Sequence, residues 1–258
     1  MLAAPKRLLR KTAQAALRPF GFDLERIPRG EYQLKSLVPD VPHEVIRTSA
    51  TYAPWQNDQD FRATYEEIRG FTLVDPYRCY ELWTLAGRLA RLRGDAVEVG
   101  VWRGGTGALI ARKLKSAAPD RFVYLCDTFT GVAGAGLQDT HYKGGEHADT
   151  SIEVVRALLD RMELKNTRIL VGTFPQETAE SVSSAELALV HIDVDVHDSA
   201  KWCFEWAWPR LVSGGVVVFD DYGFHGCEGI TRMVNAITKP DATIIYNLNG
   251  HAIAVKSQ

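Results

Sequence analysis

The feature that most constrains the fold is a regular alternation of short apolar runs with helical segments across residues 96–237. The apolar runs predict strands at 96–100, 122–127, 167–171, 187–193 and 215–220. The segments between and after them predict helices at 105–117, 151–162, 175–183, 198–208 and 227–237. Strands that alternate with helices form a parallel sheet covered on both faces, so we expect a doubly wound, Rossmann-like α/β fold.

The end of the chain predicts a different kind of pairing. Residues 242–248 and 251–256 are apolar runs that flank Asn249-Gly250, a strong signal for a two-residue β-hairpin turn. We therefore expect the sheet to be closed by a C-terminal antiparallel hairpin.

Capping signals locate several helix starts. Asp75 followed by Pro76 predicts a helix that runs to about Arg93, and residues 60–69 predict a shorter helix before it. Thr150 with Glu153 fits a capping box. Asp198 fits the cap of the helix after the fourth strand.

The first part of the chain differs in charge from the rest. Residues 1–29 carry seven bases and two acids, and their apolar residues recur at helical spacing, which predicts a basic amphipathic helix. Such a helix fits peripheral contact with an anionic membrane, and it equally fits packing within a homo-oligomer or a mobile tail. Residues 30–58 are expected to be an irregular arm. We therefore divide the chain into a helical N-terminal extension, 1–70, and a main domain, 71–258.

Composition narrows the class of protein. The chain has 258 residues, 46% of them hydrophobic, and a net charge of −2, which argues against nucleic acid as a partner. Its four cysteines are widely spaced and without a CxxC pair, as is typical of reduced thiols in the cytoplasm. No apolar run approaches the roughly 20 residues that span a bilayer.

Three aspartates follow neighbouring strands. Asp193 ends the fourth strand and the pair Asp220-Asp221 ends the fifth, so the carboxylates are expected to meet at one edge of the sheet. Carboxylates this close repel one another unless a cation neutralises them, and oxygen ligands favour Mg²⁺ or Mn²⁺. We expect Asp195 to lie just outside this set of metal ligands.

A glycine-rich turn, 97–107, follows the first strand and predicts a cofactor site. Gly100 allows a sharp turn, and Gly104 with Gly105 is expected to admit a cofactor close to the main chain. Asp127, at the end of the second strand, fits a ribose ligand of either a nicotinamide or an adenosylmethionine cofactor, or a cap of the next turn. The expected cofactor contacts are Gly100, Val101, Gly104, Asp127, Thr128 and Phe174. Phe174 fits either a flank of an adenine ring or a buried core aromatic.

Histidines add candidates for a base. His197 is expected to face the site, either as a base or as a bystander, whereas His191 sits inside a strand and is expected to pack in the core. The glycine-rich segment 128–149 lacks periodicity, which is typical of a lid or binding loop or of disorder. His141 and His147 lie in it.

Across residues 70–235, the chain resembles the metal-dependent sugar O-methyltransferases of the macrocin, mycinamicin and novobiocin type, which are class I S-adenosylmethionine-dependent enzymes. The resemblance rests on FTLVDPYRCYELW (71–83), VEVGVWRGGTGALIA (97–111), DTFTGV (127–132), GTFPQET (172–178), HIDVDVHDSAK (191–201) and LVSGGVVVFDDYGFHGC (211–227). A doubly wound sheet closed by a hairpin is also the architecture of such methyltransferases.

The resemblance implies roles for individual residues. It implies Asp193, Asp220 and Asp221 as ligands of Mg²⁺ or Mn²⁺, Asp193 also as the general base, and Glu98 and Asp127 at S-adenosylmethionine. The family's usual Asp-Gly-Asp-x-Tyr reads Asp-Val-Asp-Val-His at 193–197, which alters the expected contacts with the acceptor.

The expected reaction is methyl transfer to a hydroxyl of a sugar or glycosylated small molecule. Three alternatives stay open: a catechol-type O-methyltransferase, a metal-dependent hydrolase that uses the acids and histidines of 191–198, and a non-catalytic binding protein.

Overall fold

The computed structural model describes residues 4–20, 22–26, 32–36, 40–44, 50–184 and 186–257, with side chains for 11–20, 40–44, 50–184 and 186–257. The chain forms two compact units, Met1–Tyr52 and Ala53–Gln258. The boundary falls before the expected 70/71 because helix α2 (Gln59–Ile68) belongs to the second unit. Phe61 and Ile68 of α2 are buried in the same core as helices α3 (Pro76–Leu89) and α4 (Gly105–Ala117).

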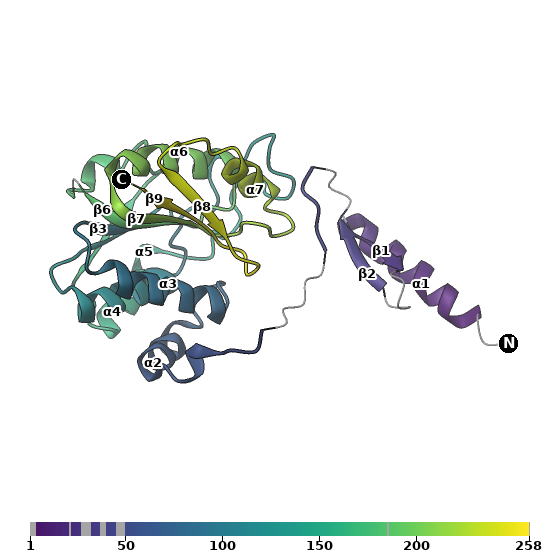
Figure 1. Ribbon diagram of the computed structural model, residues 1–258, viewed down its shortest axis with the longest axis horizontal. Helices are drawn as coiled ribbons and strands as arrows, with labels where there is room; N and C mark the ends of the chain where they lie inside the picture. The colour runs from purple at the N-terminus through teal and green to yellow at the C-terminus, as the bar shows by residue number, and fades with distance from the viewer. Residues whose placement is uncertain are drawn as a thin grey trace. The chain divides into compact units, whose positions relative to one another are not determined.

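The first unit contains the expected N-terminal helix, α1 (Ala4–Leu17), followed by the 3₁₀ turn η1 (Arg18–Phe20). It also contains a hairpin that the sequence did not predict: strands β1 (Phe22–Arg26) and β2 (Tyr32–Ser36) pair antiparallel (Figure 1). The expectation of an irregular arm from residue 30 is therefore wrong for β2. Most of the basic face expected on α1 lies outside the described side chains.

The second unit is built on a seven-stranded sheet with the order β5-β4-β3-β6-β7-β9-β8. The central strands are parallel, whereas β9 pairs antiparallel with both β7 and β8. The strands are β3 (Asp95–Val99), β4 (Val123–Asp127), β5 (Thr167–Val171), β6 (Leu187–Ile192), β7 (Leu211–Phe219), β8 (Ala242–Tyr246) and β9 (Ala252–Lys256). The doubly wound sheet and its closing hairpin are confirmed.

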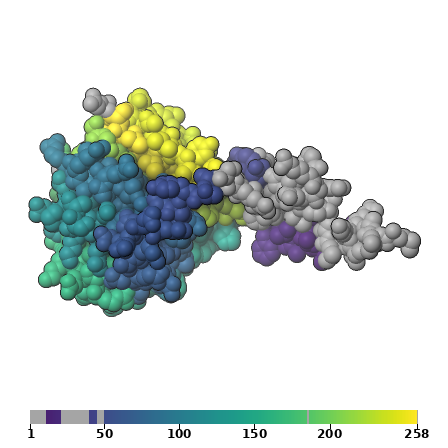
Figure 2. Space-filling model, turned by 60° about the horizontal axis from the view of Figure 1, so that its bottom comes forward, coloured from purple at the N-terminus to yellow at the C-terminus, as the bar shows by residue number. Residues whose placement is uncertain are grey.

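Helices cover both faces of this sheet (Figure 1). On one face α3, α4 and α5 (Ile152–Arg161) pack around Leu82, Ile110 and Leu158, together with α2. On the other face α6 (His197–Ala207) and α7 (Glu228–Asn235) pack around Phe204 and Ile230. The remaining short turns are η2 (Pro54–Gln56), η3 (Ala179–Ser181) and η4 (Trp208–Arg210). Figure 2 shows the face on which the C-terminal strands (yellow) adjoin the early helices of the unit (blue to teal).

One predicted helix is absent. Residues 175–183 form successive turns and the single 3₁₀ turn η3 instead of an α-helix. Glu177 accepts a hydrogen bond from Thr173 N at 2.6 Å, and this contact folds the chain into a turn directly after Gly172. The other expected helices of the alternating region are present as α4, α5, α6 and α7.

Two of the three expected caps are wrong. Asp75 does cap α3, since its carboxylate accepts hydrogen bonds from Tyr77 N and Arg78 N. Helix α5, however, is capped by Ser151, while the Thr150 hydroxyl donates to Trp102 O. Helix α6 begins without a cap from Asp198, because Asp139 of the 128–149 loop accepts the hydrogen bond from His197 N at 2.9 Å.

The closing hairpin has a longer loop than the two-residue turn that Asn249-Gly250 predicts. Strand β8 ends at Tyr246 and β9 begins at Ala252. The Asn247 side chain accepts hydrogen bonds from Asn249 N and His251 N, which holds the loop closed. All four cysteines are free and buried, as expected of reduced thiols. Among the described residues, none of the helices combines the length and the apolar character needed to span a bilayer.

Candidate functional site

A cavity of about 250 Å³ lies at the carboxyl ends of β3, β4, β6 and β7. In open α/β sheets this edge is the usual place for ligands. Its lining combines the glycine-rich turn, the second strand's acidic end and the aspartates that follow the fourth and fifth strands. The lining residues singled out from the sequence are Gly100, Val101, Asp127, Thr128, Phe174, Asp193, Asp220 and Asp221.

Gly100 is required by a close approach of two strand ends. Its φ is +87°, and a Cβ added there would lie 1.6 Å from Asp193 O. Main-chain hydrogen bonds from Gly100 N to Cys126 O and from Asp193 N to Val99 O join β3 to both neighbouring strand ends. The residue therefore fixes the first strand's turn directly against Asp193.

Gly104 and Gly105 serve packing rather than the approach of a cofactor. Gly104 has φ +89° and starts α4 against Val155, and it does not line the cavity. Gly105 faces the main chain of Phe71, whose carbonyl accepts a hydrogen bond from Gly105 N at 2.9 Å. The structural reason for these glycines is thus the tight packing of α4, contrary to the sequence-based expectation.

Asp127 holds the glycine-rich turn. Its Oδ2 accepts hydrogen bonds from Val101 N at 2.7 Å and Trp102 N at 2.8 Å, and its Oδ1 accepts one from Phe129 N at 2.7 Å. Asp127 therefore caps the turns next to it, which was one of its two predicted roles. The carboxylate is half-buried and lines the cavity, and Oδ1 keeps capacity to accept a further hydrogen bond. Its contact with a ribose stays a prediction.

Glu98 lies beneath the cavity rather than in its lining. The side chain is fully buried, and Oε1 lies 3.0 Å from His191 Nδ1. The structure gives Glu98 no direct contact with the cavity, which differs from the role expected for it at the cofactor. Phe174 does line the cavity, and its ring packs edge-on against Trp206 with centroids 4.8 Å apart.

The structure brings the three aspartates together. One carboxylate oxygen from each of Asp193, Asp220 and Asp221 lies within 4.8 Å of the others. They come from the ends of β6 and β7, which are hydrogen-bonded neighbours. This donor set of hard oxygens fits Mg²⁺ or Mn²⁺.

The pKa values of these acids differ in direction. Burial and the charges of Asp220 and Asp221 raise the pKa of Asp193 well above its ordinary value. Burial and the charges of Asp220 and Asp195 do the same to the pKa of Asp221. Burial also raises the pKa of Asp220, but the nearby His251 and Arg78 outweigh burial and hold that pKa below its ordinary value. In the metal-free protein, the surroundings therefore stabilise the charged form of Asp220 but not the charged forms of Asp193 and Asp221.

Arg78 is a site residue that sequence reasoning missed. Its Nη1 lies 2.7 Å from Asp220 Oδ2 and 3.5 Å from Asp221 Oδ1, and only 7% of the side chain is exposed. The signal was present in the Asp75-Pro76 helix start, which sets Arg78 in the first turn of α3. Nothing local indicated that this turn faces the acids.

Asp195 and Tyr142 extend the acid cluster. Asp195, Tyr142 and Asp221 all line the cavity, and oxygen atoms of Asp195 and Asp221 lie within 4.8 Å of each other. Asp195 and Asp221 both have left-handed backbones, with φ of +63° and +61°, which is uncommon for residues other than glycine. Such strain is often found at functional sites.

The 128–149 loop contributes to the cavity, whereas His197 does not. Tyr142 and His147 line the cavity from this loop. His197 begins α6 with its Nδ1 2.7 Å from Asp198 Oδ1, and it is not part of the lining. The structure therefore does not support the expected role of His197 as a base, because its ring is engaged outside the site.

His251 is a second residue near the acid cluster that sequence reasoning did not identify. Its Nε2 lies 2.8 Å from Asp220 Oδ1 and its Nδ1 lies 2.6 Å from Glu81 Oε2. Burial lowers the pKa of this imidazole, but the two carboxylates outweigh burial and raise the pKa above its ordinary value.

Known proteins resemble this chain in sequence and fold. The macrocin-O-methyltransferase (TylF) family matches residues 43–247. The 8-demethyl-8-(2,3-dimethoxy-alpha-L-rhamnosyl)-tetracenomycin-C 4'-O-methyltransferase of Streptomyces olivaceus is 33% identical over 145 residues, which are 52% of this chain and 55% of the relative. The mycinamicin III 3''-O-methyltransferase of Micromonospora griseorubida is 30% identical over 148 residues, covering 52% and 58%.

The chain thus spans about half the length of the curated relatives that it matches. Among solved structures, the O-methyltransferase NovP aligns with a TM-score of 0.63 at 24% identity, covering 73% of this chain and 83% of NovP. That similarity confirms the fold.

Proposed function

The chain belongs to the macrocin-O-methyltransferase family, and from that premise we propose that it methylates a hydroxyl of a sugar or glycosylated small molecule. The proposed cofactors are S-adenosylmethionine and a divalent cation, Mg²⁺ or Mn²⁺. The observation that carries the proposal is the composition of the cavity. Its lining includes Asp127 and the glycine-rich turn together with the carboxylates of Asp193, Asp220 and Asp221.

The cofactor end suits a nucleoside with a charged tail. Asp127 fixes the main chain at Val101 and Trp102, and Cys126 O accepts a hydrogen bond from Gly100 N, so the turn is held by contacts within the protein. We assign Asp127 Oδ1 to a ribose hydroxyl and the ring of Phe174 to the adenine, with Thr128 beside them. Positioning of this kind accounts for a large part of catalysis when two substrates must meet in line.

The acid end suits a cation. Burial, followed by the charges of neighbouring aspartates, raises the pKa values of Asp193 and Asp221, and a divalent ion would offset both effects. Asp193, Asp220 and Asp221 would hold the ion, and Arg78 keeps Asp220 oriented. When bound, S-adenosylmethionine supplies an electrophilic methyl group and the divalent ion supplies charge that stabilises a developing alkoxide.

Asp193 is the proposed base. Asp193 lines the cavity, its main chain abuts the turn at Gly100, and its carboxylate belongs to the acid cluster, so the residue lies between the two ends of the site. Tyr142 and His147 border the same space and are proposed to contact the acceptor and exclude water.

Binding measurements test this function. We would titrate the full chain with S-adenosylmethionine by calorimetry, with Mg²⁺ and with EDTA, and compare the Asp220→Asn/Asp221→Asn double variant. We expect the cofactor to bind in both conditions and in both proteins, and Mg²⁺ binding to this site to be lost in the variant. Absence of cofactor binding by the wild-type protein would overturn the proposal.

An acceptor screen then separates substrate classes. Glycosides and aromatic diols would be incubated with the protein, S-adenosylmethionine and Mg²⁺, and methylated products identified by mass spectrometry. We expect products only from glycosides, whereas methylation of diols alone would favour the catechol-type alternative.

Two further measurements on the wild-type protein test its proposed partners. Binding to anionic vesicles tests the proposed membrane contact of α1, and the molecular mass of the protein in solution tests the proposed homo-oligomer.

A further inference from the structure

Three strands bring two histidines and an aspartate together beneath the cavity. His191 lies on β6, Asp220 follows β7 and His251 precedes β9. These strands are hydrogen-bonded neighbours, with Ile192 opposite Phe219 and Phe219 opposite Ala252. His191 and His251 have no exposed surface and Asp220 is 3% exposed. Ligand atoms of the three side chains lie within 4.8 Å of one another.

The Nδ1 atom of each imidazole contacts a glutamate carboxylate. Glu98 Oε1 lies 3.0 Å from His191 Nδ1, and Glu81 Oε2 lies 2.6 Å from His251 Nδ1. This contact occupies only Nδ1 of each ring. Nε2 of His191 is unpaired among the described residues, and Nε2 of His251 lies 2.8 Å from Asp220 Oδ1. Histidines that bind metals almost always have their second nitrogen anchored in this way.

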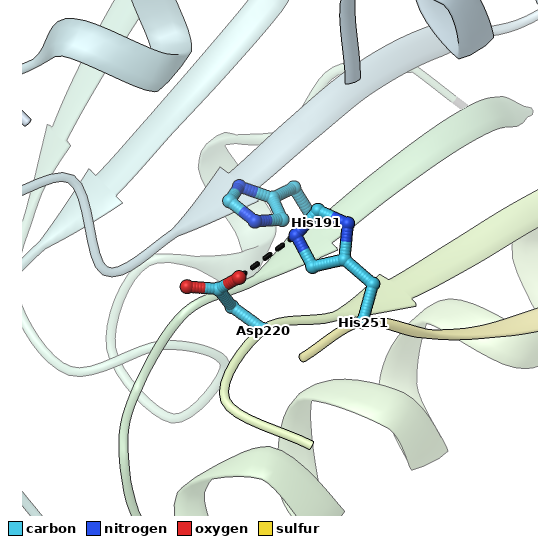
Figure 3. Close-up of side chains that lie close together, drawn as sticks. All are labelled: His191, Asp220 and His251. Atoms are coloured by element: carbon cyan, nitrogen blue, oxygen red, sulfur yellow. Dashed lines mark ion pairs between the residues drawn. The ribbon is translucent and has the colours of Figure 1, made fainter. Parts of the chain in front are cut away.

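Three ligand atoms remain: His191 Nε2, His251 Nε2 and Asp220 Oδ1. The last two form an ion pair, whereas the first is unpaired among the described residues. Figure 3 shows the two rings beside the Asp220 carboxylate, with the ion pair between His251 Nε2 and Asp220 Oδ1 at 2.8 Å. His191 Nε2, in contrast, has no hydrogen-bond partner among the described residues although the residue is fully buried. Buried polar atoms of this kind are costly unless something binds them.

We propose that His191 Nε2, His251 Nε2 and Asp220 Oδ1 bind a divalent transition-metal ion of the Zn²⁺ class. Two imidazoles and one carboxylate favour such an ion over Mg²⁺, which prefers oxygen ligands. The site is distinct from the carboxylate triad in the cavity, although Asp220 belongs to both. The Asp220 Oδ2 atom faces Arg78, so the two oxygens of this carboxylate face different partners.

The position of the ion indicates a structural role. Asp220 lines the cavity, but neither histidine does. An ion at this place would link β6, β7 and β9 beneath the cavity and hold the C-terminal hairpin to the parallel part of the sheet. The ion would replace the Nε2 proton that His251 shares with Asp220. The inference does not depend on methyl transfer.

Cobalt substitution tests the site. The full-length protein would be stripped with chelator and titrated with Co²⁺, whose d–d absorption bands report coordination by nitrogen ligands, and Zn²⁺ affinity would be measured by competition. We expect visible bands from a Co²⁺ ion bound through nitrogen ligands, in addition to any ion held by the carboxylate triad. We expect His191→Gln or His251→Gln to weaken binding of Zn²⁺ at this site by about 100-fold or more. No bands with the wild-type protein would overturn the proposal.

Matched variants separate this site from its neighbours. Asp193→Asn removes a ligand of the cavity triad only, and we expect it to keep the Co²⁺ bands. Cys227→Ser controls for the nearby group of Asp195, Asp221 and Cys227, and it should also keep them. If either variant loses the bands as completely as His251→Gln does, the ion is bound elsewhere and the inference fails.

A milder variant covers the case in which the histidine variants do not fold. Glu81→Gln alters the anchor of His251 and the hydrogen bond that Glu81 Oε2 accepts from Asn247 Nδ2, and the Glu81 side chain is 29% exposed. We expect this variant to keep its circular dichroism spectrum and to bind Zn²⁺ about 10- to 100-fold more weakly. A folded Glu81→Gln protein with unchanged Zn²⁺ affinity would contradict the assignment.

Discussion

Arg78 Nη1 lies 2.7 Å from Asp220 Oδ2, which places a cation from the start of helix α3 directly on the acids at the edge of the sheet. Nε of the same guanidinium is 2.7 Å from Asp75 Oδ2, and the group stacks over the Phe224 ring at 4.6 Å. The guanidinium is therefore fixed from three sides. It supplies part of the positive charge that the aspartates require.

Replacing Arg78 by Gln should strongly destabilise the metal-free protein. Removal of one partner from a buried ion pair leaves an uncompensated charge, and we expect a loss of about 3 kcal/mol or more in the free energy of unfolding. Arg78→Lys keeps the charge and should lose less. Urea denaturation in EDTA measures both, and Mg²⁺ should restore part of the loss in Arg78→Gln. Equal losses in the two variants would show that packing, not charge, sets the effect.

Gly100→Ala should be among the most damaging single substitutions in the domain. The added Cβ would meet Asp193 O at 1.6 Å, and φ at this position is +87°. We expect a cost of about 4 kcal/mol or more, since both backbone strain and a main-chain clash contribute. Gly145→Ala is the matched control, because φ there is +88° and nothing lies within 4 Å of the added atom. It should cost only about 1–2 kcal/mol in urea denaturation.

Asp139→Ala should weaken the start of α6 and loosen the 128–149 loop. Asp139 Oδ1 accepts from His197 N, and Oδ2 accepts from Gly136 N, both at 2.9 Å. Loss of such a cap costs about 1–2 kcal/mol, so the melting temperature should fall and proteolysis within the loop should become faster. Asp198→Ala, which the sequence alone identifies as the cap, should change neither quantity by much. The reverse order of effects would contradict the structure.

The strand ends explain which parts of the site follow from sequence. Asp193 and Asp220 end neighbouring parallel strands, so their convergence follows from the alternation of strands and helices alone. The same argument extends to His251, because an antiparallel β9 that begins opposite Phe219 places the preceding residue beside Asp220. Both signals were present in the sequence, but the order of β8 and β9 in the sheet was needed to combine them.

Other contacts depend on tertiary packing that no local pattern encodes. Asp139 lies in a loop without periodicity, and its role as a cap depends on where that loop crosses the start of α6. Glycines 104 and 105 illustrate another limit, because a glycine-rich turn has the same sequence signature whether a ligand or a neighbouring part of the protein fills the space beside it. Here the neighbours are the Val155 side chain and the Phe71 main chain. The hairpin of β1 and β2 has only a weak alternating pattern, although the five residues between its strands include the turn formers Pro28 and Gly30.

The pH dependence of stability should reverse the usual behaviour of carboxylates at this site. The pKa values of Asp193 and Asp221 are raised in the metal-free folded protein, mainly by burial. The folded protein therefore keeps protons that the unfolded chain releases above its ordinary carboxyl pKa of about 4. The contribution of these two groups to the free energy of unfolding then falls as the pH rises from about 4 toward their raised pKa values.

Mg²⁺ should act in the opposite direction, because it binds the deprotonated carboxylates and releases these protons. The increase in melting temperature caused by Mg²⁺ should therefore grow with pH over the same range. Thermal melts at a series of pH values, in EDTA and in Mg²⁺, measure both effects. Asp193→Asn removes one of the two groups and should flatten both dependences, whereas Asp149→Asn, an exposed acid outside the cavity, should leave them unchanged. A stabilisation by Mg²⁺ that is independent of pH would show that the ion does not bind these carboxylates.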